Sequence, residues 1–161
     1  LNRAGTDCQL AIETSGHAAL QENYFLDDGA YLAAKIVIKA ARLKQEGRPI
    51  SSVLADLEDP ADEKEVRIPI KTEDFGAYGD QVLSDLKDWV KTQDGMTLTE
   101  PNYEGVRIDF GDGWCLLRKS LHDPILPMNM ASDQEGGCQA IEKVMKSFLN
   151  QYEKLGLEGV L

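Results

Sequence analysis

The first polar loop of the chain, residues 13–17, carries a carboxylate, two hydroxyls, a glycine and an imidazole. Glu13 can accept hydrogen bonds from paired hydroxyls of a sugar, and Ser15 can donate or accept another. Gly16 lets the backbone turn closely past a ligand, and His17 can exchange a proton near neutral pH. On residue types alone, an ordinary polar turn explains this loop as well.

The second polar loop, residues 118–124, places two cations and a hydroxyl side by side. Arg118 offers a guanidinium fork and Ser120 a hydroxyl donor, a combination that binds phosphate. Strand alternation predicts Arg118 and Ser120 on one face and Lys119 on the other. His122 adds a donor when it is protonated. A basic strand end that balances an acidic surface is the alternative explanation.

Other polar positions have simpler explanations than chemistry. Asp27 and Asp28 could ligate a metal, but two carboxylates at a helix start are typical caps. Ser15, His17 and Asp27 do not form a credible hydrolase triad, and the chain has no G-x-S-x-G nucleophile motif. Gly136 and the glycine after it could admit an anion at a helix start, although a flexible entry into the helix is the simpler explanation.

The overall charge limits the partners of these loops. The chain has 161 residues with 17 Lys+Arg and 28 Asp+Glu, which gives a net charge of −11. Such a chain repels nucleic acid and anionic membranes, so we expect neither as a partner. The widely spaced Cys8, Cys115 and Cys138 fit neither a zinc site nor a disulfide framework, so a reducing compartment is expected: the cytoplasm, or the plastid stroma if the source is a plant or alga. The start without Met or an apolar signal core suggests a truncated chain.

The elements that carry the first loop make up an incomplete unit. Residues 8–13 are predicted to form a short strand, and apolar residues at helical spacing predict a helix from Asp28 to Gly47. A second, short helix is predicted to end at Leu57. One strand and two helices cannot bury their apolar faces alone, so residues 1–57 need the rest of a domain or a partner. Residues 58–65 are charged, contain a proline and are predicted to be a linker and hinge.

The elements after this linker predict a complete two-layer α+β domain over residues 66–161. Alternating apolar residues predict a strand that begins at Val66, in which Pro69 favours an edge position. The strongest hairpin signal runs over 106–119 around Gly111-Asp112-Gly113. The expected order is β-α-β-β-β-α, with elements at 66–70, 78–94, 106–110, 114–119, 125–130 and 141–156.

The two polar loops together resemble two loops of the α-D-phosphohexomutases, the family of phosphoglucomutases and phosphomannomutases. Residues 13–17 resemble the E-x-S-G-H sugar-binding loop of the third domain. Arg118-x-Ser120 with Asp123-Pro124 resembles the phosphate loop of the fourth domain, usually R-x-S-[NG]-T-[EQ]-P. Leu121 and His122 depart from that pattern and resemble a variant of some bacterial and plastid members. The motifs occur in the expected order, and the resemblance covers nearly the whole chain.

The resemblance implies a fold and roles for both loops. Residues 66–161 would be the C-terminal domain, similar in topology to the TATA-box-binding protein, and residues 1–57 would be the C-terminal part of the third domain. Glu13 and Ser15 would hold sugar hydroxyls, and His17 would be a candidate general acid/base. The phosphate that is not transferred would be bound by Arg118, Ser120, Leu121 and His122.

The resemblance also implies an activity for a larger parent protein. Such a protein would interconvert hexose 1-phosphate and hexose 6-phosphate, of glucose or mannose, through a phosphoserine and a hexose 1,6-bisphosphate. The phosphoserine loop and the Mg²⁺ loop, D-G-D-x-D-R, do not occur in this sequence, so we expect no metal ligand here, inactivity of the chain alone and a need for the missing N-terminal domains. A non-catalytic phosphosugar-binding or regulatory module, or a protein-interaction domain, are the alternatives.

Overall fold

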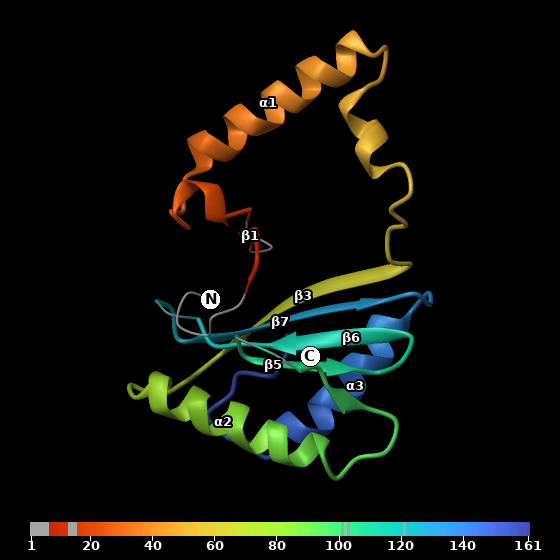
Figure 1. Cartoon of the computed structure of the whole chain (residues 1–161). Helices are drawn as coiled ribbons and strands as arrows, with labels where there is room; N and C mark the ends of the chain where they lie inside the picture. Colours follow the sequence, from red (N-terminus) through yellow and green to blue (C-terminus); the bar gives the residue numbers. More distant parts are fainter. Residues whose placement is uncertain (1–6, 13–15, 101, 103, 121) are drawn as a thin grey trace. The chain divides into compact units, whose positions relative to one another are not determined.

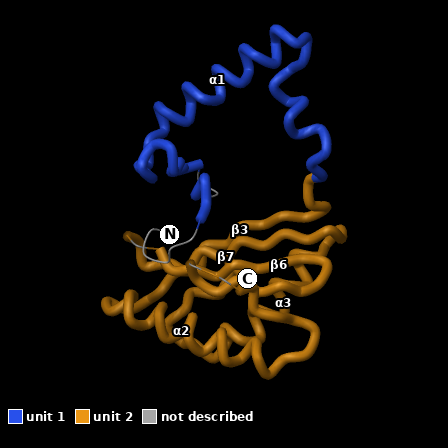
Figure 2. Tube along the Cα trace, in the orientation of Figure 1, with its two compact units in different colours: residues 1–58 blue, residues 59–161 orange. Residues whose placement is uncertain are grey.

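The chain divides into two compact units, Leu1–Glu58 and Asp59–Leu161 (Figure 2). The computed structural model describes residues 7–12, 16–100, 102, 104–120 and 122–161. Glu13, Ser15 and Leu121, three of the predicted site residues, lie outside the described residues.

The second unit contains an antiparallel five-stranded sheet (Figure 1). The order of the strands across the sheet is β3-β7-β6-β5-β4. Their bounds are Asp62–Pro69 for β3, Thr97–Leu98 for β4, Val106–Asp109 for β5, Gly113–Leu117 for β6 and Ile125–Ser132 for β7. The helices α2 (Phe75–Val90) and α3 (Gly137–Leu149) lie on the same side of this sheet in Figure 1.

The core of this unit lies between the sheet and the two helices. Alternate residues of β3, β5 and β6 are buried, as the two-residue period of a strand requires when helices cover one face. The Asp74 carboxylate accepts a hydrogen bond from the Ala77 N–H at 3.3 Å and so caps α2. Fully buried side chains from both layers meet there, among them Ile68, Val82, Leu86, Ile108, Leu117, Met128, Met145 and Leu149.

The structure confirms the α+β class and corrects two details of the prediction. A short strand, β4, precedes the hairpin, so the order is β-α-β-β-β-β-α rather than β-α-β-β-β-α. The linker predicted over 58–65 is too long, because Asp62–Glu65 already pair with β7. These residues escaped the pattern because Glu63 and Glu65 are exposed on an edge strand, where charged side chains interrupt the apolar alternation. The predicted edge position of Pro69 is confirmed.

The first unit has a small hairpin and one long helix. The strands β1 (Leu10–Ile12) and β2 (Ala18–Leu20) pair with Leu10 opposite Leu20. The helix α1 runs over Gly29–Gln45, and the Asp28 carboxylate accepts from the Tyr31 N–H at 3.0 Å, so Asp28 is the cap that was predicted. The second helix, predicted to end at Leu57, is a 3₁₀ helix over Ile50–Leu54. The strand β2 was not predicted, because three residues are too few for a pattern.

Large apolar side chains are exposed in the first unit. Ile36, Val37 and Ile38 on α1 have 52%, 67% and 51% of their surface exposed. By contrast, Leu43 is the only residue of α1 that is buried. A helix with this much apolar surface in water gains little from packing. These side chains form an apolar surface on α1 that the described residues of the first unit leave exposed.

The three cysteines are free thiols in different surroundings, which gives a first testable prediction. Burial raises the pKa of the Cys115 thiol to about 12, and burial together with Asp62 raises that of Cys138. Because the thiolate is the reactive form, both should be unreactive near pH 8. Cys8 is only half-buried. We expect one thiol to react quickly with Ellman's reagent and two more only on unfolding, and three fast thiols would contradict this packing.

Candidate functional site

The loop that begins at Arg118 continues the pairing of β6 with β7 beyond the end of the strand. The Arg118 N–H donates to the Pro127 carbonyl at 3.0 Å, and the Ser120 N–H donates to the Ile125 carbonyl at 3.2 Å. Both N–H groups point toward the same neighbouring strand, so the side chains of Arg118 and Ser120 lie on the same face of the sheet. The backbone thus places Arg118 and Ser120 in the alternation that the sequence predicted.

The Ser120 hydroxyl organises the turn that follows. Its oxygen accepts hydrogen bonds from the backbone N–H groups of His122 and Asp123, at 3.4 and 3.2 Å. A hydroxyl that accepts in this way keeps its own hydrogen for a ligand. His122 is exposed. The turn therefore places a hydroxyl donor close to Arg118 in the sequence, while the N–H groups of His122 and Asp123 hold the hydroxyl oxygen.

Lys119 lies on the face of the sheet that the helices cover, and its ammonium bonds to α2. Its ammonium donates to the Asp80 carboxylate at 2.6 Å and to the Gly76 carbonyl at 3.2 Å, both on α2. Gly79 leaves space for the lysine stem, because a Cβ at Gly79 would lie 3.0 Å from Lys119 Cδ. The predicted separation of Lys119 from Arg118 is confirmed. Sequence reasoning did not find Asp80 or Gly79, since their spacing on α2 carries no signal for a contact with a distant loop.

Lys119 should therefore matter for stability and not for anion binding. Lys119→Met keeps the apolar stem and removes the ammonium, so it should lower the free energy of unfolding by about 1 kcal/mol, as for a partly exposed ion pair. Urea unfolding measures this loss. Phosphate binding by the loop should stay within twofold of that of the unchanged chain. A tenfold loss of binding would instead place Lys119 in the anion site.

Arg118 lies on the face of the sheet opposite α2 and α3, beside other charged side chains. Its Nη1 atom is 3.4 Å from Glu104 Oε1, and its side chain is 29% exposed. The pKa of Glu65 is held below its usual range by the Arg67 guanidinium first, then by Asn129, with a contribution from the charge of Arg118. The guanidinium of Arg107 stacks over the Trp114 ring at 4.0 Å. Arg67, Arg107 and Arg118 thus lie on one face of the sheet, two of them paired with carboxylates and the third stacked on a ring.

His17, the candidate acid/base, lies in the first unit beside a carboxylate. Its Nδ1 atom is 2.8 Å from Asp27 Oδ2, and both side chains are largely exposed. Asp27 is held in place by the bridge between its backbone and Ala19 of β2. A carboxylate at Nδ1 fixes the orientation of an imidazole ring. The sequence analysis considered Asp27 as a cap, as a metal ligand and in a triad that it rejected, and the structure makes it the partner of His17.

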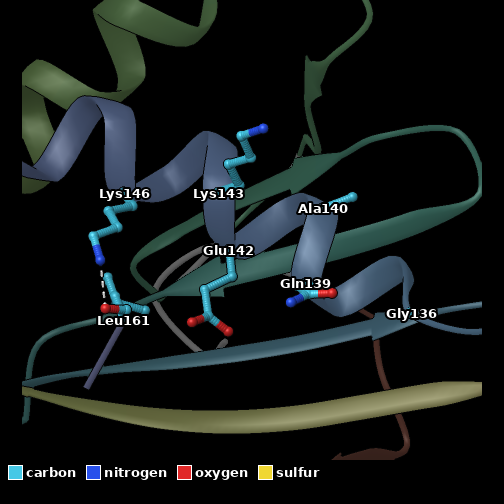
Figure 3. Close-up of a pocket in the computed structure, with 7 residues that line it drawn as sticks. All are labelled: Gly136, Gln139, Ala140, Glu142, Lys143, Lys146 and Leu161. Atoms are coloured by element: carbon cyan, nitrogen blue, oxygen red, sulfur yellow. Dashed lines mark hydrogen bonds between the residues drawn. The ribbon is translucent and has the colours of Figure 1, made fainter. Parts of the chain in front are cut away.

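A separate hollow lies along α3 (Figure 3), and its lining includes Gly136, the possible anion-binding entry to a helix, but not His17, Arg118, Ser120 or His122. Its volume is about 510 Å³, and the Lys146 ammonium donates to the Leu161 carbonyl at 2.5 Å beside it. The lining residues are Gly136, Gln139, Ala140, Glu142, Lys143, Lys146 and Leu161. The hollow is open and its lining is mixed in charge, so we assign no ligand to it.

Among the described residues, no three His, Cys, Asp or Glu side chains gather in a way that could hold a metal ion. In the same part of the chain, no helix has both the length and the apolar character needed to cross a bilayer.

Comparisons with known proteins place the chain beside phosphohexomutases. It is 31% identical over 147 residues to the phosphomannomutase/phosphoglucomutase of Pseudomonas aeruginosa, an alignment that covers 91% of this chain and 29% of the relative. It is 29% identical over 150 residues to the protein of the same name from Pseudomonas putida, covering 92% of the chain and 30% of the relative. A phosphoglucomutase of Neisseria meningitidis is 27% identical over 151 residues, covering 93% and 31%. No family profile matches the chain.

The fold has a counterpart among solved structures. The crystal structure of a phosphoglucomutase/phosphomannomutase family protein from Burkholderia thailandensis matches with a TM-score of 0.68 and 21% sequence identity. The match covers 99% of this chain and 31% of that one. The chain therefore spans about 30% of the length of the relatives that it matches. It is homologous to the C-terminal part, about 30%, of phosphomannomutase/phosphoglucomutase proteins.

Proposed function

We propose that the chain forms the sugar- and phosphate-binding C-terminal part of a phosphohexomutase that interconverts hexose 1-phosphate and hexose 6-phosphate. The observation that carries the proposal is the loop after β6. There Arg118 and Ser120 lie on one face, while Lys119 lies on the opposite face and bonds to Asp80. A guanidinium fork beside a hydroxyl donor is suited to a phosphate that must be held and not transferred. Homology to the corresponding part of mutases supports the same function.

In this proposal each loop binds one end of the substrate. Arg118, Ser120, Leu121 and His122 bind the phosphate that is not transferred, and the Ser120 hydroxyl donates to one of its oxygens. Glu13 and Ser15, outside the described residues, hold sugar hydroxyls. His17, oriented by Asp27, exchanges the proton of the reacting hydroxyl. Glucose, mannose or both fit these contacts.

The proposed assignment of domains follows from the two units. Residues 59–161 correspond to the fourth domain of the family, with a topology similar to the TATA-box-binding protein. Residues 1–57 correspond to the end of the third domain. The exposed apolar residues of α1 support this assignment, because the remaining part of such a domain would cover them.

The phosphoryl donor and the metal are proposed to belong to another part of the same protein. A phosphoserine would donate to the hexose phosphate to give a hexose 1,6-bisphosphate, and Mg²⁺ would stabilise the charge of the transferred group. This chain would contribute binding, orientation and proton exchange. The chain alone should therefore bind phosphosugar without converting it.

The test is an assay of the protein that contains this chain. Purified protein is mixed with glucose 1-phosphate, Mg²⁺ and a trace of glucose 1,6-bisphosphate, and glucose 6-phosphate is detected by coupled oxidation. We expect turnover, with the chain alone inactive under the same conditions. Mannose 1-phosphate in a parallel assay reports on the sugar. Saturable binding of phosphosugar without turnover by the whole protein would support the non-catalytic alternative and contradict the mutase.

A further inference from the structure

The segment before β5 is built to press against the Arg118 loop. Gly105 has a φ of +63°, and a Cβ at this position would lie 2.3 Å from the Leu117 carbonyl oxygen and 2.8 Å from Arg118 Cβ. The Gly105 carbonyl accepts a hydrogen bond from the Asn102 side-chain amide at 3.1 Å. The Asn102 side-chain oxygen accepts from the Glu104 N–H at 3.3 Å. Only glycine lets the two segments lie so close.

The consequence of this packing is the position of Glu104. Its carboxylate lies 3.4 Å from Arg118 Nη1, a long contact with one oxygen and not a bidentate fork. The Glu104 side chain is 57% exposed, so it can swing into solvent. A phosphate can form two shorter bonds with the same guanidinium and carries more charge. Both anions cannot approach Arg118 together without repulsion.

We propose that Glu104 is an internal counter-ion of Arg118 that the substrate phosphate displaces, so that this carboxylate sets the affinity of the loop. The proposal rests on the proposed function of Arg118 as the phosphate ligand. In the free chain, Glu104 keeps the guanidinium from pairing with other anions. When phosphate binds, the contact between Glu104 and Arg118 breaks and the carboxylate turns to solvent. The Glu104 carboxylate then competes with the phosphate for Arg118 and so favours release of the phosphate after each half-reaction.

The test is to neutralise Glu104 without changing its size. Glu104→Gln should bind glucose 1,6-bisphosphate about threefold more tightly than the unchanged chain, the size expected for one exposed ion pair. Binding to the whole chain is measured by isothermal titration calorimetry at constant ionic strength. Asp88→Asn is the matched control: it removes one carboxylate from an exposed pair with Lys91, 2.8 Å away on α2, and should leave the affinity unchanged.

The outcomes separate this inference from the proposed function. If the unchanged chain binds and Arg118→Ala does not, but Glu104→Gln binds no more tightly, the counter-ion role is wrong while the phosphate site stands. Weaker binding by Glu104→Gln would also overturn it, because the carboxylate would then be orienting Arg118. An equal gain in Asp88→Asn would assign the effect to net charge alone. If Arg118→Ala binds as well as the unchanged chain, the proposed phosphate site itself fails.

Discussion

Replacing Arg118 with alanine should reduce the affinity of the chain for glucose 1,6-bisphosphate by about 100-fold, equivalent to roughly 3 kcal/mol for a charge-assisted pair of hydrogen bonds. Of the two cations that begin the loop, Lys119 bonds to Asp80 on α2, whereas the Arg118 guanidinium makes only a 3.4 Å contact with the exposed Glu104 carboxylate among the described residues. Calorimetric titration of the variant measures the loss.

Arg107→Ala is the matched control for this prediction. It removes the same charge from the same sheet, but its guanidinium lies over the Trp114 ring at 4.0 Å and outside the loop. The loss of its long-range attraction should lower the affinity of Arg107→Ala for the ligand by no more than about threefold, because salt screens exposed charges beyond about 10 Å. Equal losses in both variants would show that the sheet attracts anions through its overall charge and has no specific phosphate ligand.

The second large effect is expected at Gly105. Gly105→Ala should lower the free energy of unfolding of the second unit by about 3 kcal/mol, of which about 1 kcal/mol is the left-handed backbone and the rest is collision. The new Cβ would lie 2.3 Å from the Leu117 oxygen, a distance that forces β6 and the Arg118 loop to move. Urea unfolding measures the loss of stability, and calorimetry should show weaker binding of phosphate.

Gly111→Ala isolates the steric part of that effect. Gly111 also has a positive φ, +90°, but its Cβ would meet nothing within 4 Å. This variant should lose only about 1 kcal/mol, through backbone strain. If the two alanine variants are equally stable, the close approach of the Gly105 segment to Arg118 is not present in solution.

The elements with strong periodicity could be predicted from the sequence. Alternation around a glycine turn predicts the hairpin of β5 and β6, and apolar stripes predict α1, with Asp28 at its start, and α2. The charged half of β3 could not be predicted, because Glu63 and Glu65 on an exposed edge resemble a linker. The two-residue strand β4 is too short to have a period.

The candidate site divides in the same way. Strand alternation predicts that Arg118 and Lys119 lie on opposite faces of the sheet, and the structure confirms this. The contacts of Glu104 and Asp80 with these cations join segments far apart in the chain, and no local pattern encodes such pairs. Gly105 reads as an ordinary turn glycine, and only the packing explains why that position excludes a side chain.

The most direct test of the central claim is to map the binding of glucose 1,6-bisphosphate to the chain by NMR. Backbone amide shifts are followed during the titration and compared with those of Arg118→Ala. We predict that the shifts centre on Arg118, Ser120 and His122, saturate, and disappear in the variant. Shifts that centre on the hollow along α3, or none at millimolar ligand, would contradict the claim that this loop holds the phosphate.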